Sequence, residues 1–198
     1  MIKDFDLLQR ANNDYTTIDL EHAEELAYRE LIDSIRYIPL GDECGVMGNI
    51  ANIITYKGRF YIQEEQFDRV FIYDDTGRCL KKIDNKGRGP GEYLRIESID
   101  INTEKEELML VDGMSDKLFF YDLDGNFKSI HSIRYFQTEN TLCLRDSVFL
   151  HISAPSQNFG NEGLYGYALV LSKGNENFLK GYRYLPLQVG YKGGGQIF

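Results

Sequence analysis

The sequence predicts an all-β fold of the β-propeller type, built from four-stranded antiparallel blades. Two patterns predict it. After residue 35, short apolar or alternating runs are separated by turns rich in Gly and Asp, with no helical period between them. In addition, one segment recurs without a gap 48 residues further along the chain. The chain also holds 14 Tyr and 12 Phe with no Trp, which agrees with a strand-rich fold because aromatic residues favour strands.

The turns between the expected strands carry the residues that tight turns require. Asp74–Gly77 and Asp122–Gly125 both pair an Asp, which bonds back to the nearby backbone, with a Gly, which takes positive φ. Short strands joined by such turns form antiparallel sheets. The expected strands are Ile50–Tyr56, Arg59–Gln63, Arg69–Tyr73, Cys79–Ile83, Ile96–Ile101, Glu107–Val111, Lys117–Tyr121 and Phe127–Ile130.

The repeat aligns residues 60–77 with residues 108–125. Each copy holds about four strands, which is the content of one propeller blade. A single blade cannot bury both of its faces, so blades must stack around an axis. We expect Asp68-Arg69 and Asp116-Lys117, which occupy the same blade position, to make structural hydrogen bonds between adjacent strands. The matched pairs are Asp68 and Asp116, Arg69 and Lys117, Tyr73 and Tyr121, Asp74 and Asp122, and Gly77 and Gly125.

The first 35 residues differ from the rest and form an N-terminal strand and helix leader. Thr16–Leu20 is compatible with a short strand, and Glu21–Ile35 carries a helical apolar stripe with acidic residues in its first turns. Arg36–Leu40 is predicted to be a strand, at an edge or an end because of Pro39. Residues 36–198 are predicted to form a partial propeller with blades at about 49–86, 94–135 and 140–198.

Charge and hydropathy exclude several classes of function. The net charge of −9, from 31 acidic and 22 basic residues, disfavours a general nucleic-acid binder because an acidic surface repels phosphate. No run approaches the roughly 20 apolar residues of a membrane span. The first ten residues lack the continuous apolar core of a secretory signal, so the chain as given reads as soluble.

The three cysteines lie far apart in the sequence. Cys44, Cys79 and Cys143 show no CxxC spacing, and their number is odd. This pattern argues against a disulfide framework and against a zinc site. We therefore expect three small buried hydrophobic residues.

Three motifs in order resemble a known family. These motifs are similar to the NHL repeat. They are Tyr37–Leu40, the run Gly87-Arg88-Gly89-Pro90-Gly91-Glu92-Tyr93, and the segment 108–127. They resemble more closely the six-bladed β-propeller proteins of gut Bacteroides-type bacteria, in which a GRGPGEY turn separates the first two blades. The resemblance covers about residues 18–130. It implies export, in the periplasm or at the outer membrane, and it implies no established function.

The chain departs from this pattern after Ile130. Asn140–His151 and Leu164–Leu171 read as strands, but the Asp-x-x-Gly turn does not recur at the repeat spacing. Six blades need roughly 290 residues by multiplication of the repeat, whereas residues 49–198 hold about three. Three readings remain open: a fragment of a longer protein, a homodimer of two half-rings that completes the propeller, and a small natural variant.

The glycine-rich turn does not match a phosphate loop. Gly87, Gly89 and Gly91 fit neither GxGxxG nor GxxxxGK[ST], and no helix follows. Glu92 also places a negative charge where a phosphate would sit. We predict an inter-blade crossover, in which Arg88 is the residue to examine for a ligand because propeller loops line the channel and the faces.

No motif singles out catalytic, cofactor-binding or metal-ligating residues. Asp122–Asn126 hints at a calcium loop but lacks the Gly and Glu of the EF-hand, so we predict a turn. Some propeller hydrolases hold calcium on the axis, and Glu64, Asp112 and Asp116 are candidates for that role. His22, His131 and His151 show no ligand spacing, and no Ser or Cys lies in a nucleophile motif.

The prediction for function is a non-catalytic binding module of the bacterial cell envelope. Its expected partner is a glycan, a peptide or another envelope protein, and its possible ligand-facing residues are Arg88, Glu64, Asp112 and Asp116. The alternative is a calcium-dependent hydrolase or lyase with the metal on the propeller axis.

Overall fold

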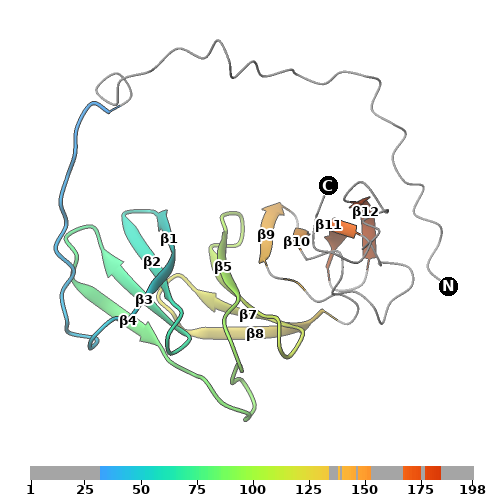
Figure 1. Ribbon diagram of the computed structural model, residues 1–198, viewed down its shortest axis with the longest axis horizontal. Coiled ribbons are helices and arrows are strands. Elements are labelled where there is room, and N and C mark those ends of the chain that lie inside the picture. The colour runs from blue at the N-terminus through green and yellow to red at the C-terminus, as the bar shows by residue number, and fades with distance from the viewer. Residues whose placement is uncertain are drawn as a thin grey trace, which may run out of the picture.

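The structure is a computed structural model that describes residues 32–133, 138, 140–145, 147–152, 167–174 and 177–183. In these ranges the chain forms three four-stranded antiparallel sheets, which lie one after another as propeller-like blades (Figure 1). The sheet orders are β1-β2-β3-β4, β5-β6-β7-β8 and β12-β11-β10-β9. The all-β prediction is confirmed. The strands are β1 Ile50–Tyr56, β2 Arg59–Glu64, β3 Arg69–Asp74, β4 Cys79–Ile83, β5 Ser98–Asn102, β6 Glu107–Asp112, β7 Lys117–Asp122, β8 Phe127–Ser132, β9 Asn140–Arg145, β10 Val148–Ile152, β11 Tyr167–Lys173 and β12 Asn177–Arg183.

The predicted Asp-x-x-Gly turns close the β3–β4 and β7–β8 hairpins. The Asp74 carboxylate accepts hydrogen bonds from the backbone N–H groups of Thr76 and Arg78, and Gly77 has φ of 87°. Asp122 makes the same contacts in the second blade, and Gly125 has φ of 80°. These are turns, as predicted, because the carboxylate of each Asp is occupied by its own loop.

Two apolar cores join the three sheets. Blades 1 and 2 enclose Tyr61, Ile72, Tyr93, Leu110 and Phe119, each at most 1% exposed. Blades 2 and 3 enclose a second cluster, which consists of Met109, Val111, Leu118, Phe120, Ile133, Phe149 and Val170. The middle strands β2, β3, β6 and β7 therefore bury both of their faces, as a stacked array of blades requires.

The outward face of blade 1 is covered by the segment Ile38–Met47, which we call the strap. Its Gly41 N–H donates to the Gly77 carbonyl at 2.7 Å, and the Tyr73 hydroxyl donates to the Gly41 carbonyl at 3.2 Å. Met47 of the strap packs on Ile62 and Phe71 of the sheet. The strap thus seals a sheet face that would otherwise be exposed.

A disulfide bond fixes the strap to the sheet, and the prediction against a disulfide was wrong. Cys44 of the strap bonds to Cys79 of β4, with their Cα atoms 6.0 Å apart. Pairing depends on distance in space, and the path of the strap over β4 brings together two residues that are 35 positions apart. Cys143 is free and half-buried, as expected of a small hydrophobic residue, and burial raises the pKa of its thiol to about 11.

The strand predicted at Arg36–Leu40 is not found, and most of the region predicted before it lies outside the described residues. Arg36–Leu40 is not a strand; its last three residues begin the strap, in which Pro39 has no N–H to donate to a neighbour. Of the predicted helix, Ile32–Ile35 is not helical, and 21–31 lies outside the described residues, as does Thr16–Leu20. None of the described ranges contains a helix long and apolar enough to cross a membrane.

The antiparallel topology divides the connections between two ends of the blades. The β2–β3 turn, the β6–β7 turn and the β4–β5 linker, residues 84–97, lie at one end, which we call the linker face. The β1–β2, β3–β4, β5–β6 and β7–β8 turns lie at the opposite end, the hairpin face.

Candidate functional site

All four residues singled out from the sequence lie on the linker face. Glu64 and Asp112 end β2 and β6, Asp116 ends the β6–β7 turn, and Arg88 lies in the β4–β5 linker. The structure therefore places them at one end of the first two blades. Their roles differ, because three belong to internal contacts and one points to solvent.

The glycine-rich turn of the linker is filled by its own glutamate. The Gly89 N–H donates to Glu92 Oε2 at 2.7 Å, and the Glu92 N–H donates to the Gly89 carbonyl at 3.1 Å. A Cβ on Gly87 would lie 1.9 Å from the same carboxylate, and Gly91 has φ of 83°. The site of a phosphate is thus taken by an intrinsic anion. Arg88 is exposed and forms no ion pair with any residue that the structure describes.

Tyr93, the last residue of this motif, anchors the linker between blades 1 and 2. Its ring is fully buried and meets the Phe119 ring edge-on, with 5.9 Å between the centroids. Its hydroxyl donates to the Asp68 carbonyl at 2.9 Å and accepts the Asn85 N–H at 3.1 Å. Burial raises the pKa of this phenol well above its usual range, so the group stays neutral.

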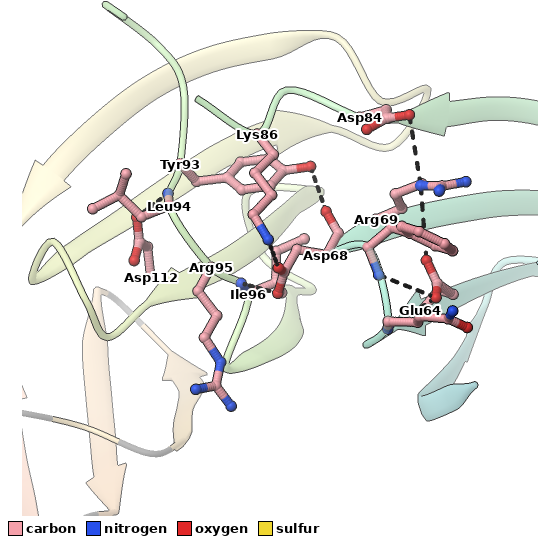
Figure 2. A network of polar contacts seen from close by, with 12 residues as sticks. Glu64, Asp68, Arg69, Asp84, Lys86, Tyr93, Leu94, Arg95, Ile96 and Asp112 are labelled. Carbon is pink, nitrogen blue, oxygen red and sulfur yellow. Dashed lines mark hydrogen bonds and ion pairs between the residues drawn. The ribbon is translucent and has the colours of Figure 1, made fainter. Parts of the chain in front are cut away.

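Asp68 connects the β2–β3 turn of blade 1 to the linker (Figure 2). Its Oδ1 accepts the Ile96 N–H at 3.1 Å, and its Oδ2 pairs with Lys86. Asp68 has φ of 57°, a conformation that Asp and Asn tolerate better than most residues. Asp68 thus makes structural hydrogen bonds as predicted, but they join its turn to the linker and not to an adjacent strand.

Glu64 and Asp112 are equivalent in the repeat and close equivalent turns. Glu64 Oε1 accepts the N–H groups of Gln66 and Phe67 at 2.9 and 3.3 Å. Asp112 Oδ1 accepts two N–H groups of its own turn, and its Oδ2 accepts the Leu94 N–H and the Ser115 hydroxyl at 2.8 and 2.6 Å. Both side chains are at most 1% exposed. They act as buried acceptors for backbone N–H groups.

The Glu64 carboxylate also belongs to a charged cluster at the end of β3. Glu64 Oε2 lies 3.8 Å from Arg69 Nε, and Arg69 Nε lies 3.6 Å from Asp84 Oδ2. Neither Glu64 Oε2 nor Arg69 Nε has a hydrogen-bond partner among the described residues. The guanidinium of Arg69 also stacks over the Phe67 ring at 4.2 Å.

Asp116 lacks the partners that Asp68 has at the same blade position. Its Oδ1 is buried without a hydrogen bond to any described residue, although its carbonyl accepts the Ile133 N–H at 2.6 Å. Burial, and then the neighbouring Asp112 charge, raise the pKa of the Asp116 carboxyl. Within the described ranges, no group of three or more His, Cys, Asp or Glu side chains is placed to hold a metal ion.

A groove of about 360 Å³ lies beside this network, between the start of β1, the β2–β3 turn and the linker. Its floor includes Gln63, which donates from Nε2 to the Ile96 carbonyl at 3.0 Å and is 3% exposed. Arg95 points away from the Lys86–Asp68 pair in Figure 2, and its Nε lies 3.3 Å from Glu97 Oε1. The groove is lined by Asn49, Ala51, Gln63, Glu65, Gln66, Asp68, Arg95, Ile96 and Glu97.

Sequence reasoning missed most of the groove. Gln63 and Gln66 flank Glu64, and Arg95 and Glu97 follow the GRGPGEY motif, so all four lie near residues that the sequence did single out. No local pattern marks them, because the groove exists only where the linker packs against blade 1.

One serine–histidine contact occurs in blade 3. Ser172 Oγ lies 2.8 Å from His151 Nε2, and Thr141 Oγ1 lies 2.9 Å from His151 Nδ1. Ser172 and His151 are each 3% exposed, and Thr141 is fully buried. A nucleophile must reach its substrate, so this chain of hydroxyl and imidazole groups stabilises the sheet.

Comparisons with solved structures support the fold. A crystal structure of a "putative exported protein" from Bacteroides fragilis superposes with a TM-score of 0.67 and 19% identity, covering 80% of this chain and 44% of that chain. U3-55K gives 0.49 and 11%, with coverages of 68% and 39%. A DUF4221 family member from Bacteroides vulgatus gives 0.44 and 9%, with coverages of 69% and 44%. The last two scores are too low to carry an argument.

The chain spans less than half the length of the Bacteroides fragilis structure. No curated protein matches the sequence. The assignment of the repeat to the NHL type and the count of six blades stay predictions. A family model described as "Domain of unknown function (DUF4934)" matches residues 15–189. Because this match covers most of the chain, the protein belongs to the DUF4934 family.

Proposed function

We propose that the chain is a non-catalytic binding module that acts outside the cytoplasm and holds a segment of another protein in the groove between blade 1 and the linker. The groove itself carries the proposal. Its volume of about 360 Å³ lies within the range of ligand sites, and its two walls, blade 1 and the linker, are held together by the contacts of Asp68 with Tyr93 and Ile96. A preformed site loses little free energy to ordering when a ligand binds.

The lining residues favour a peptide over the other expected partners. The groove offers both hydrogen-bond donors and acceptors, which an extended polypeptide can pair with its backbone N–H and carbonyl groups. They come from the side-chain amides of Asn49 and Gln66 and from the charged groups of Glu65, Arg95 and Glu97. None of the nine lining residues is aromatic, so a sugar ring has no face to stack on there. A glycan remains the alternative ligand, and the experiment below separates the two.

Two observations support a location outside the cytoplasm. Disulfide bonds persist in oxidising compartments such as the bacterial periplasm, and Cys44–Cys79 forms one here. The similar Bacteroides fragilis protein is described as exported. Thiol labelling of cells that express the full gene tests this: Cys44 and Cys79 should resist a thiol reagent until a reductant is added. Labelling of both without reductant contradicts it.

The binding proposal is tested by panning a displayed library of random peptides against the chain. We expect peptides that bind the wild type and lose at least tenfold in affinity for the double variant Gln66→Ala/Arg95→Ala. The exposed lysine of β4 provides the control, because Lys81→Ala changes charge outside the groove and should leave affinity unchanged. Equal binding to the double variant, or enrichment only on a glycan array, overturns the peptide proposal.

The calcium-dependent alternative receives support from a single observation, the unpartnered Asp116 Oδ1 beside the Asp112 charge. The oxygens of Asp112 already accept four hydrogen bonds, which leaves them poorly suited to a cation. A ligand that binds only the folded state raises the melting temperature. A melting temperature that rises with millimolar calcium in the wild type but not in Asp116→Asn would favour the hypothesis of a calcium-dependent enzyme.

A further inference from the structure

The groove between blade 1 and the linker has a hydrogen-bond acceptor in its floor. Gln63 is 3% exposed, and its Nε2 donates to the carbonyls of Ile96 and Glu97 at 3.0 and 3.3 Å. These two bonds fix the orientation of the amide, because only its nitrogen can donate. Its Oε1 accepts no hydrogen bond from any residue that the structure describes. Because Gln63 lines the groove, this oxygen is available to a donor that enters it.

Three carboxylates line the groove, and two of them already have a basic partner. Asp68 pairs with Lys86, and Glu97 Oε1 lies 3.3 Å from Arg95 Nε. Glu65 is exposed and forms no ion pair within the described part of the chain. The groove therefore holds one negative charge that nothing in the described structure neutralises.

Gln63 and Glu65 face the groove together. They are two residues apart at the end of β2, and side chains two apart lie on the same face of a strand. The Glu65 N–H donates to the Asn49 carbonyl at 3.0 Å, which continues the pairing with the start of β1 beyond Glu64. Gln63 and Glu65 both line the groove, whereas Glu64 between them does not. A ligand group with several donors can therefore contact both.

Blade 2 shows that the fold does not require acceptors at these two positions. In the 48-residue repeat, Gln63 corresponds to Val111 and Glu65 corresponds to Gly113. Val111 is fully buried in the apolar core that joins blades 2 and 3. The position between the two keeps its turn-closing carboxylate in both blades, as Glu64 and Asp112. The turn-closing group is thus common to the two blades, and the two groove acceptors are particular to blade 1.

We propose that the segment held in the groove presents a basic side chain, Lys or Arg, to Gln63 Oε1 and the Glu65 carboxylate. This inference rests on the proposed function, because it names the residue that the groove selects in a bound peptide. The Lys ammonium has three N–H donors, the Arg guanidinium has five, and neither accepts. A cation therefore satisfies both groups, whereas a neutral donor leaves the Glu65 charge unpaired and an acidic side chain is repelled. The net charge of −9 also attracts a cationic segment.

The test uses four synthetic peptide libraries whose central residue is fixed as Lys, Arg, Gln or Glu. The flanking positions are random mixtures of uncharged residues, and the N-termini are acetylated, so the central side chain is the only charge that differs. We expect the immobilised wild type to retain the Lys or the Arg library at least tenfold more than the Gln and Glu libraries. High salt should reduce this excess, because it screens the Glu65 charge. The ratio of Lys to Arg retention distinguishes an ammonium from a guanidinium ligand.

Two substitutions at Glu65 isolate its charge at an exposed position, where folding should be unaffected. Glu65→Gln should lose the preference for a basic residue, and Glu65→Lys should shift the preference to the Glu library. Asp75→Asn is the matched control, because Asp75 is an exposed carboxylate in the β3–β4 turn on the hairpin face. It changes the net charge by the same amount and should keep the wild-type preference. Gln63→Leu, checked for folding by its melting curve, should weaken the preference by removing the acceptor.

The outcomes separate this inference from the proposed function on which it rests. Equal retention of the four libraries, with the loss of affinity in Gln66→Ala/Arg95→Ala, overturns the basic-residue preference and leaves the peptide groove in place. Retention of none of the libraries overturns both. A preference that falls equally in Glu65→Gln and Asp75→Asn also overturns the inference, because it would then follow from the net charge of the chain and not from the groove.

Discussion

The hydroxyl of Tyr93 donates a hydrogen bond of 2.9 Å to the backbone carbonyl of Asp68, and this contact joins the linker to the first blade. The same hydroxyl accepts the Asn85 N–H, so one buried atom satisfies two backbone groups. We expect Tyr93→Phe to lower the free energy of unfolding by about 1–2 kcal/mol, because both groups lose their partner in a buried site. Urea denaturation measures this change.

The control for this prediction is Tyr37→Phe, since Tyr37 is 88% exposed and its hydroxyl is free to bind water. That variant should unfold at the wild-type urea concentration. If Tyr93→Phe also unfolds at the wild-type urea concentration, the Tyr93 hydroxyl does not stabilise the contact between the linker and blade 1, and only the packing of its ring does so.

Asp68 and Asp116 occupy the same blade position, yet their variants should behave in opposite ways. Asp68→Asn weakens the ion pair with Lys86 and should cost about 1 kcal/mol, because Lys86 is half-exposed and solvent screens the pair. Asp116→Asn removes a buried charge that has no hydrogen bond on Oδ1 and lies near Asp112, so it should be neutral or stabilising at pH 7. Asn tolerates the positive φ at both positions.

Thermal and urea unfolding of the two variants provide the comparison. Equal destabilisation by both substitutions would show that Asp116 has a partner equivalent to Lys86, and would contradict the environment described for it.

The first two blades could be predicted from the sequence because their strands are short, their turns carry Asp and Gly, and their repeat is exact in length. Blade 3 was harder, since the turn between β11 and β12 contains Gly174 but no matching Asp. The disulfide depends on the path of the strap across β4, which no spacing of Cys44 and Cys79 reveals. The groove combines residues from blade 1 and from the linker, and only their packing brings Gln66 and Arg95 to one site.

The Cys44–Cys79 disulfide should contribute about 2–4 kcal/mol to stability, mainly because it restricts the unfolded chain across a separation of 35 residues. We expect a reductant to lower the melting temperature of the wild type and to have no effect on Cys44→Ala/Cys79→Ala. Cys143→Ala is the control, because Cys143 is a free thiol, and it should retain the full response to reductant. A wild type whose melting temperature is the same with and without reductant would contradict this contribution.

His151 should make the stability of the chain depend on pH in a defined window. Burial between Thr141 and Ser172 lowers the pKa of the imidazole to about 4 from the 6.5 of an exposed histidine. Between these values the unfolded chain binds a proton and the folded chain does not, so stability is complete above pH 6.5 and declines as the pH falls to about 4. The loss from this group should be about 3 kcal/mol.

His151→Gln isolates this effect, because Gln retains one donor and one acceptor but does not titrate. The variant should be less stable than the wild type at pH 8, since the ring packs 6.1 Å from Phe149 and fills the blade 2–blade 3 core. The stability difference between the two proteins should then shrink from pH 6.5 to pH 4, while the carboxylates common to both cancel. A difference that stays constant over this range would show that His151 binds its proton equally well in the folded and unfolded chains, and that burial does not hold it neutral.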